Sequence, residues 1–266
     1  MCGIHAILTT TPATDTYART VRGLHDLQHR GQRGYGVSYV TPSSSQAIHT
    51  QTFDGLVPSV TDDPTQHPST RAAIGHVRYP TSGSTLPTSQ QPLQPFQHTH
   101  PTLGEYAICH NGHIAELDSD TDKTDTQKLV TWLHAHTDVS DWVELLLRVL
   151  DQLPNAYCLL VLTADGVYAV RDAQGVRPLC IGWADEVSNA DAYGEPANVV
   201  VTAGRVAISS ETCALYDKGY TIDTVPVASV MQCSFGAHGI VCSRHTLVSS
   251  RVPAAHCLFE SIYFAN

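Results

Sequence analysis

The sequence lacks any C-x-x-C pair, although it contains eight cysteines. The cysteines are scattered along the chain, which argues against a structural zinc site and against a short-spaced disulfide framework. We therefore expect a reduced, cytoplasmic protein.

Basic residues and long apolar runs are also scarce. Fifteen Lys and Arg against 25 Asp and Glu give a net charge of -10, which offers no basic surface for nucleic acid. Apolar stretches such as 158–162 are far too short to cross a bilayer, and no charged region precedes an apolar run at the N-terminus. Neither nucleic acid nor a membrane is expected as a partner.

Nucleotide and metal motifs are missing as well. No G-x-G-x-x-G or G-K-[ST] loop occurs, and we expect no cofactor. Fifteen histidines raise the question of a metal, but the compact group His98, His100, His110 and His113 has no carboxylate or thiolate at a recognised ligand spacing. We therefore predict no metal site.

The remaining composition is that of a globular protein with a substantial core. Hydrophobic residues make up 42% of the 266 residues and charged residues 15%. Strands are predicted at 4–8 and 36–40, with a hairpin over 156–171; helices are predicted at 15–28, from 125 onward and at 141–153, with a short helix near 209–216. Because no regular alternation of strand and helix appears, the pattern indicates an α+β protein with largely antiparallel sheets.

Cys2 directly follows the initiator methionine. Removal of Met1 would leave a thiol and a free amine on one residue, with ordinary pKa values of about 8.5 and 8, so the amine could act as the base for its own nucleophile. Cys2 could instead be the start of a buried strand over 4–8. For Cys2 taken alone, that structural interpretation is favoured.

Two further polar segments each allow a functional and a structural interpretation. Arg30 and Gly31 begin a glycine-rich loop that lets the backbone approach something closely. Arg78 ends a predicted strand beside a loop containing Thr81, where it could hold a carboxylate, or it could be solvated on the surface. In isolation, neither segment identifies a site.

Two later motifs are similarly open. Asn111 and Gly112 favour a tight hairpin turn, but an amide side chain and the next N–H can also form an oxyanion hole. Thr124 and Gln127 have the spacing of a capping box, which places Asp125 at a helix N-terminus. Capping accounts for Asp125 unless a ligand amine lies nearby.

Together, these segments resemble the class II (N-terminal nucleophile) glutamine amidotransferase domain, in the order that family uses. The segments are Met1-Cys2-Gly3-Ile4, His29-Arg30-Gly31-Gln32, Gly75-His76-Val77-Arg78-Tyr79-Pro80-Thr81, His110-Asn111-Gly112 and Thr124-Asp125-Thr126. The similarity is greatest to the N-terminal glutaminase half of the amidophosphoribosyltransferase family, which acts in purine synthesis. Segments 54–57, 171–179, 210–215 and 257–265 resemble that family too.

The resemblance implies a role for each matched residue. Cys2 would attack the side-chain amide of L-glutamine to form a γ-glutamyl thioester and release ammonia. Asn111 and Gly112 would stabilise the oxyanion. The substrate would be bound by the remaining five residues: Arg78 and Thr81 at the α-carboxylate, Asp125 at the α-ammonium, and Arg30 with Gly31 lining the nucleophile.

The resemblance also implies the architecture. We expect an αββα sandwich, with two mostly antiparallel sheets between helix layers, as one amidotransferase domain over residues 2–266. The phosphoribosyltransferase domain that continues the family's chain has no counterpart here. Either ammonia would pass to a separate phosphoribosyltransferase-like or other acceptor chain, or the sequence is a fragment of a larger gene product. The protein could be a homo-oligomer. Two alternatives stay open: an amidotransferase serving another acceptor, and a non-catalytic module that senses glutamine or docks to a partner.

Overall fold

The computed structural model describes residues 1–41, 47–59, 68–79, 90–114, 117, 123–189, 201–216 and 218–247. The segment 257–265, part of the family resemblance, lies outside these residues.

Strands dominate the described chain. They are β1 (Gly3–Ala13), β2 (Gly34–Val40), β3 (Ile48–Asp54), β4 (Thr70–Arg78), β5 (Phe96–His100), β6 (Gly104–His113), β7 (Ala156–Thr163), β8 (Gly166–Arg171), β9 (Cys180–Asn189), β10 (Val201–Ser209), β11 (Thr221–Thr224), β12 (Ser229–Phe235) and β13 (Ile240–Thr246). The helices are α1 (Thr14–Asp26), α2 (Asp125–Ala135) and α3 (Trp142–Gln152), and short 3₁₀ turns cover Gln28–Arg30 (η1) and Thr212–Ala214 (η5).

The strands form one continuous hydrogen-bonded path. Its order is β3-β2-β4-β1-β10-β13-β12-β8-β7-β6-β5; off this path, β9 pairs with β10, and β11 pairs with β9. Every strand pair in the described residues is antiparallel, as the sequence predicted. The β1 strand is central because it pairs with β4 on one edge and β10 on the other.

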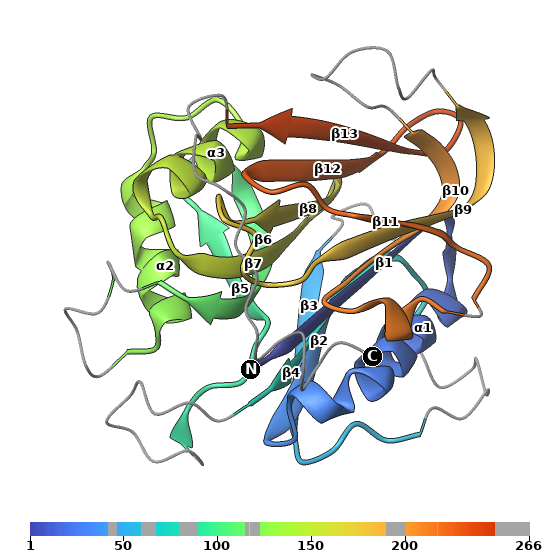
Figure 1. Cartoon of the computed structure of the whole chain (residues 1–266), viewed down its shortest axis with the longest axis horizontal. Helices are drawn as coiled ribbons and strands as arrows, with labels where there is room; N and C mark the ends of the chain where they lie inside the picture. Colours follow the sequence, from blue (N-terminus) through green and yellow to red (C-terminus); the bar gives the residue numbers. More distant parts are fainter. Residues whose placement is uncertain are drawn as a thin grey trace.

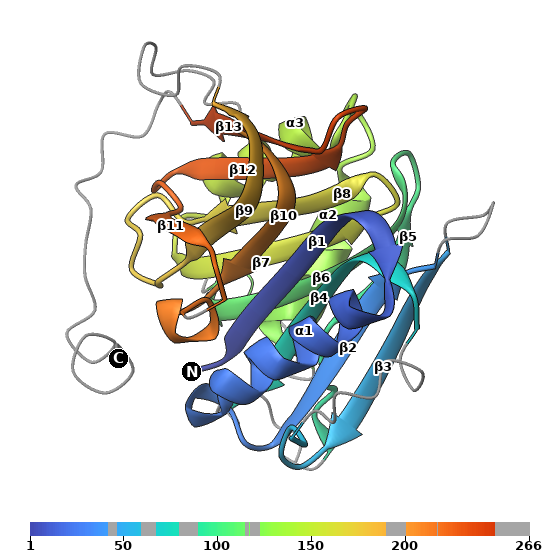
Figure 2. The same ribbon diagram turned by 90° about the vertical axis from the view of Figure 1, so that its right-hand side faces the viewer.

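Four apolar clusters lie among the described residues, and the smallest joins Ile7, Cys180, Ala207 and Leu215. The largest joins inward side chains of β1 and β4, such as Ile4 and Ile74, to those of β6 and β7, such as Cys109 and Leu160. A second packs α2 and α3 on the outer face of β6, β7 and β8, and a third packs α1 on β2 and β4. Figures 1 and 2 show α1 on one side of the strands and α2 with α3 on the other.

Local sequence signals explain the helices. The Thr124–Gln127 capping box is present in both directions, and the Asp141 side chain accepts from the Glu144 N–H at 2.9 Å at the start of α3. These two helix starts and the hairpin of β7 and β8 confirm the sequence predictions.

Other local predictions were wrong. The Asn111-Gly112 pair makes no turn, because both residues continue β6 opposite Cys158 and Tyr157 of β7. The helix expected near 209–216 is only the 3₁₀ turn Thr212–Ala214, since β10 continues to Ser209. In both places, pairing with a distant strand overrides the local preference.

Candidate active site

The start of β1 is clamped to the end of β10. The N–H of Ile4 donates to Ser210 Oγ at 3.0 Å, and the N–H of Ser210 donates to the Ile4 carbonyl at 2.9 Å. On the opposite edge Gly3 pairs with Val77 of β4. Cys2, which is half-buried, is therefore held one residue ahead of a strand that is fixed on both sides.

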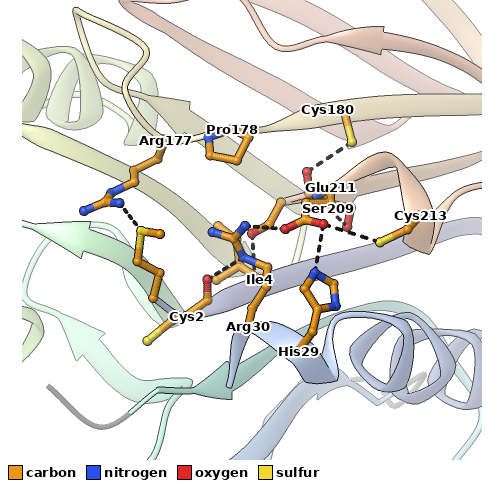
Figure 3. A network of polar contacts seen from close by, with 12 residues as sticks. Cys2, Ile4, His29, Arg30, Arg177, Pro178, Cys180, Ser209, Glu211 and Cys213 are labelled. Carbon is orange, nitrogen blue, oxygen red and sulfur yellow. Dashed lines mark hydrogen bonds and ion pairs between the residues drawn. The ribbon is translucent and has the colours of Figure 1, made fainter. Parts of the chain in front are cut away.

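Arg30 fixes the backbone of Cys2. Its side chain is fully buried, and its Nε donates to the Cys2 carbonyl at 2.9 Å (Figure 3). Gly31 packs on the end of β4, since a Cβ there would stand 2.6 Å from the carbonyl carbon of Arg78. The predicted loop thus lies beside Cys2. Arg30 reaches the main-chain carbonyl of Cys2.

Arg78 ends β4 on the face that carries Ile74 and His76. It is buried, and its guanidinium donates to the Oε1 of Gln91. Burial lowers the pKa of Arg78 from its ordinary value, whereas the charges of Cys2 and Asp125 act to raise it. Cys2 and Asp125 thus lie near enough to this guanidinium to influence its protonation.

Asn111 is a buried polar group of the site whose side-chain amide is unsatisfied. Its side chain is fully buried, and within the described part of the chain neither its Oδ1 nor its Nδ2 has a hydrogen-bond partner. Alternation along β6 puts Asn111 on the same face as Cys109 and Ala107, toward the cluster that contains Ile4. Buried amides without partners are rare, and such a group is a candidate for binding a ligand.

Gly112 is required by its conformation and its surroundings. Its φ is 146°, and a Cβ would stand 2.2 Å from the Ala156 carbonyl oxygen and 2.6 Å from Tyr157 Cα. Only glycine allows β6 and β7 to approach this closely at that φ.

Asp125 lies in the first turn of α2 with its side chain partly exposed. Its Oδ1 accepts from the Thr126 N–H at 2.9 Å, and the Nδ1 atoms of His110 and His113 each lie 3.7 Å from one of its oxygens. Thr124, rather than Asp125, provides the helix cap. Capping therefore does not account for the Asp125 carboxylate, which lies beside both imidazoles.

His110 and Gln94 tie β6 to α2. The His110 N–H donates to Gln94 Oε1 at 2.8 Å, and both side chains contact Thr126 Oγ1, at 3.0 Å from His110 Nδ1 and 3.1 Å from Gln94 Nε2. Burial lowers the pKa of His110, although the Asp125 carboxylate opposes that shift. These contacts set the position of α2, and hence of Asp125, relative to Asn111.

Several residues of the site were missed by the sequence interpretation. Glu211 pairs with Arg30, Gln91 accepts from Arg78, and Arg177 contacts the sulfur of Met1. Glu211 and Arg177 lie in segments that resemble the family, which was the only signal available for them. Thr81, predicted to bind the substrate carboxylate, lies outside the described residues.

The described residues offer one group of possible metal ligands, and it is not the histidine group considered in the sequence. His100 and His110, from the histidine group considered in the sequence, bond to different partners, the Leu133 carbonyl and Thr126. His29, Glu211 and Cys213 do bring one ligand atom each within 4.8 Å of one another. However, the Glu211 carboxylate already neutralises the buried Arg30 guanidinium. The positive charge of Arg30 opposes the binding of a second cation there.

No helix in the described ranges has both the length and the apolar character to cross a membrane.

No protein-family model matches the sequence.

Comparison with known proteins gives relatives over almost the whole chain. The sequence is 31% identical to human amidophosphoribosyltransferase, covering 92% of this chain and 49% of that protein. It is also 31% identical to the amidophosphoribosyltransferase of Methanocaldococcus jannaschii, covering 100% of this chain and 56% of that protein. The chain thus spans about half the length of the curated relatives it matches.

A solved structure shows the same fold. The B. subtilis glutamine phosphoribosylpyrophosphate amidotransferase, complexed with ADP and GMP, superimposes with a TM-score of 0.74 at 24% identity, covering 100% of this chain and 53% of that one. The chain is therefore a homologue of the amidophosphoribosyltransferases, matched to the N-terminal half of those proteins.

Proposed function

We propose that the protein hydrolyses L-glutamine to glutamate and ammonia, as the glutaminase part of a class II amidotransferase. The observation that carries this proposal is that β1, β4 and β6, whose ends bear the candidate groups, share the central apolar cluster. The start of β1 brings Cys2, the end of β4 brings Arg78, and the end of β6 brings the unpartnered Asn111 with Gly112.

The proposed reaction begins after Met1 has been removed. The Cys2 α-amine takes the thiol proton, and Sγ attacks the Cδ of the substrate amide to give a tetrahedral intermediate. Asn111 Nδ2 and the Gly112 N–H donate to its oxyanion. The C–N bond then breaks, the α-ammonium protonates the leaving nitrogen, and ammonia departs from a γ-glutamyl thioester.

Water completes the cycle. The free α-amine of Cys2 deprotonates a water molecule, whose oxygen attacks the thioester carbonyl. The C–S bond breaks, glutamate leaves and the thiol is restored. The same donor pair serves both tetrahedral intermediates, so no further group is needed for the second step.

Charged groups would hold the two ends of the substrate. Arg78 is proposed to bind the α-carboxylate by a paired contact, together with Thr81, and Asp125 to bind the α-ammonium. The influence of Asp125 on the pKa of Arg78 supports placing both within reach of one small amino acid. Arg30 and Gly31 are proposed to hold the nucleophile in place.

The architecture proposed for the chain is the αββα sandwich of N-terminal nucleophile hydrolases. It is supported by the central cluster between β1 with β4 and β6 with β7, and by the outer helix layers. We propose that residues 2–266 are one amidotransferase domain and that the ammonia acceptor, of the phosphoribosyltransferase type used in purine synthesis, lies outside them.

Release of ammonia and glutamate from L-glutamine tests the function. Intact mass first verifies that Met1 is absent, and Cys2→Ala should then abolish release. Cys242→Ala, a buried thiol in β13, is the matched control and should keep the activity. Activity that survives Cys2→Ala would remove the proposal.

A further inference from the structure

A buried network converges on the carboxylate of Glu211, which follows β10. One oxygen pairs with the Arg30 guanidinium, and the other accepts from His29 Nε2 at 2.9 Å and faces Cys213 Sγ at 3.7 Å. Figure 3 shows these side chains gathered beside the main chain of Cys2 and Ile4. The network joins segments that are 181 residues apart in the sequence.

The opposite charges of Arg30 and Glu211 are both buried, so breaking their ion pair would be costly. Arg30 is 0% exposed and Glu211 is 6% exposed. A buried guanidinium that loses its carboxylate is left as an uncompensated charge, which is far more costly than the loss of a surface ion pair. The position of the guanidinium is therefore tied to that of the Glu211 carboxylate.

The guanidinium carries that position on to the nucleophile. Its Nε donates to the Cys2 carbonyl at 2.9 Å while its terminal nitrogen is held by Glu211. The adjacent Ser210 already clamps Ile4 through two hydrogen bonds. Ser210 thus fixes the strand, and the Arg30–Glu211 pair fixes the peptide plane of Cys2 that sets the directions of its thiol and amine.

We propose that Glu211 is a positioning residue for the N-terminal nucleophile, acting through Arg30. This inference rests on the proposed glutaminase function and adds a residue to it that does not touch the substrate. Displacing a reacting group by about 1 Å costs on the order of 100-fold in rate. Because Arg78 and Asp125, which would bind the substrate, are not contacted by Glu211, the loss should fall on kcat and spare KM.

The test compares Glu211→Gln and Glu211→Asp in the full chain after Met1 removal has been verified by mass. Glu211→Gln keeps the shape but loses the charge, and kcat should fall about 100-fold with KM for glutamine within about threefold. Glu211→Asp keeps the charge on a shorter side chain and should restore only part of the rate, leaving kcat about tenfold below that of the parent.

A second readout follows the nucleophile without turnover. The rate at which iodoacetamide alkylates Cys2, measured on the N-terminal peptide by mass spectrometry, should fall severalfold in Glu211→Gln and recover only in part in Glu211→Asp. The matched control is Lys218→Met. Lys218 holds the same segment by pairing with Asp26 and donating to the Ala214 carbonyl at 2.8 Å, but it touches neither Arg30 nor Cys2. It should lower the melting temperature and leave kcat and alkylation unchanged.

Three outcomes overturn the inference: a Glu211→Gln kcat within twofold of the parent, an equal loss in Lys218→Met, or a loss confined to KM. If Glu211→Gln does not fold, a Glu211→Asp variant with unchanged kcat and unchanged alkylation overturns it as well. If the parent protein releases no ammonia, the proposed function fails, and the alkylation series still decides the role of Glu211.

Discussion

Asn111 of β6 stands opposite Cys158 of β7, and the asparagine amide is buried without a hydrogen-bond partner among the residues described. A polar group that gives up its hydration without a partner weakens the fold unless a ligand completes it. Replacing Asn111 should therefore change the activity of the protein much more than its stability, and both can be measured.

Asn111→Ala should reduce kcat about 10²- to 10³-fold, the usual loss for one oxyanion donor, with little change in KM. The free energy of unfolding should change by less than about 1 kcal/mol, because no protein hydrogen bond is removed. Steady-state ammonia release and urea denaturation check both. Asn155→Ala, outside the site, is the control. A parallel loss of stability and activity would contradict the assignment.

Gly112→Ala should destabilise the fold by about 3 kcal/mol or more, because conformational strain of about 1–2 kcal/mol adds to a clash with the backbone of β7. The control is Gly104→Ala, where φ is 84° but nothing lies within 4 Å of a new Cβ. Gly104→Ala should lower the free energy of unfolding only by the backbone strain. Denaturant midpoints compare the two variants, and equal values would show that the close approach of β6 and β7 is unimportant.

Asp125→Asn should remove recognition of the α-ammonium group. Since a hydrogen bond to a charged group contributes about 1.5–3 kcal/mol, kcat/KM for glutamine should fall about 10- to 150-fold. The analogue 4-carbamoylbutanoate, which lacks the amine, should be hydrolysed equally by the variant and the parent. Asp141→Asn, at the start of α3, is the matched helix-terminal control. Equal losses on both substrates would argue that Asp125 only supports α2.

Acid should destabilise the protein through His5, which is buried in β1. Burial lowers its pKa from 6.5 to about 3. Below pH 6.5 the unfolded chain therefore binds a proton that the folded chain does not, and stability falls as pH drops from 6.5 toward 3. At pH 5 one such group costs about 2 kcal/mol. His5→Met should lessen the loss between pH 7 and 5, and His25→Met, on the surface, is the control. A parent protein equally stable at both pH values would exclude this linkage.

The sequence allowed prediction of features that short segments determine. The Thr124–Gln127 capping box and the apolar face of α3 were predicted because their partners lie within one or two helical turns. The family resemblance supplied Cys2, Arg78 and Asn111. The structure places these residues at the ends of three strands that share one apolar cluster, which sequence spacing alone could not have predicted.

The missed features depend on long-range pairing. Asn111 and Gly112 carry the local signal of a turn, but β7 continues the ladder across them. Glu211 has no local signal because its partner Arg30 lies at the other end of the described chain. Whether a charge serves as a positioning group depends on which distant segment it meets, and that is fixed only when the sheet assembles.

The double pairing of β1 has a practical consequence. Ordinary chain ends fray, but residues 5–8 are paired to β4 and β10 at once, and Ser210 secures Ile4. Cys2, directly ahead of β1, cannot detach while the sheet remains intact. Heat inactivation of this protein should therefore coincide with cooperative melting of the whole sheet and should show no earlier phase.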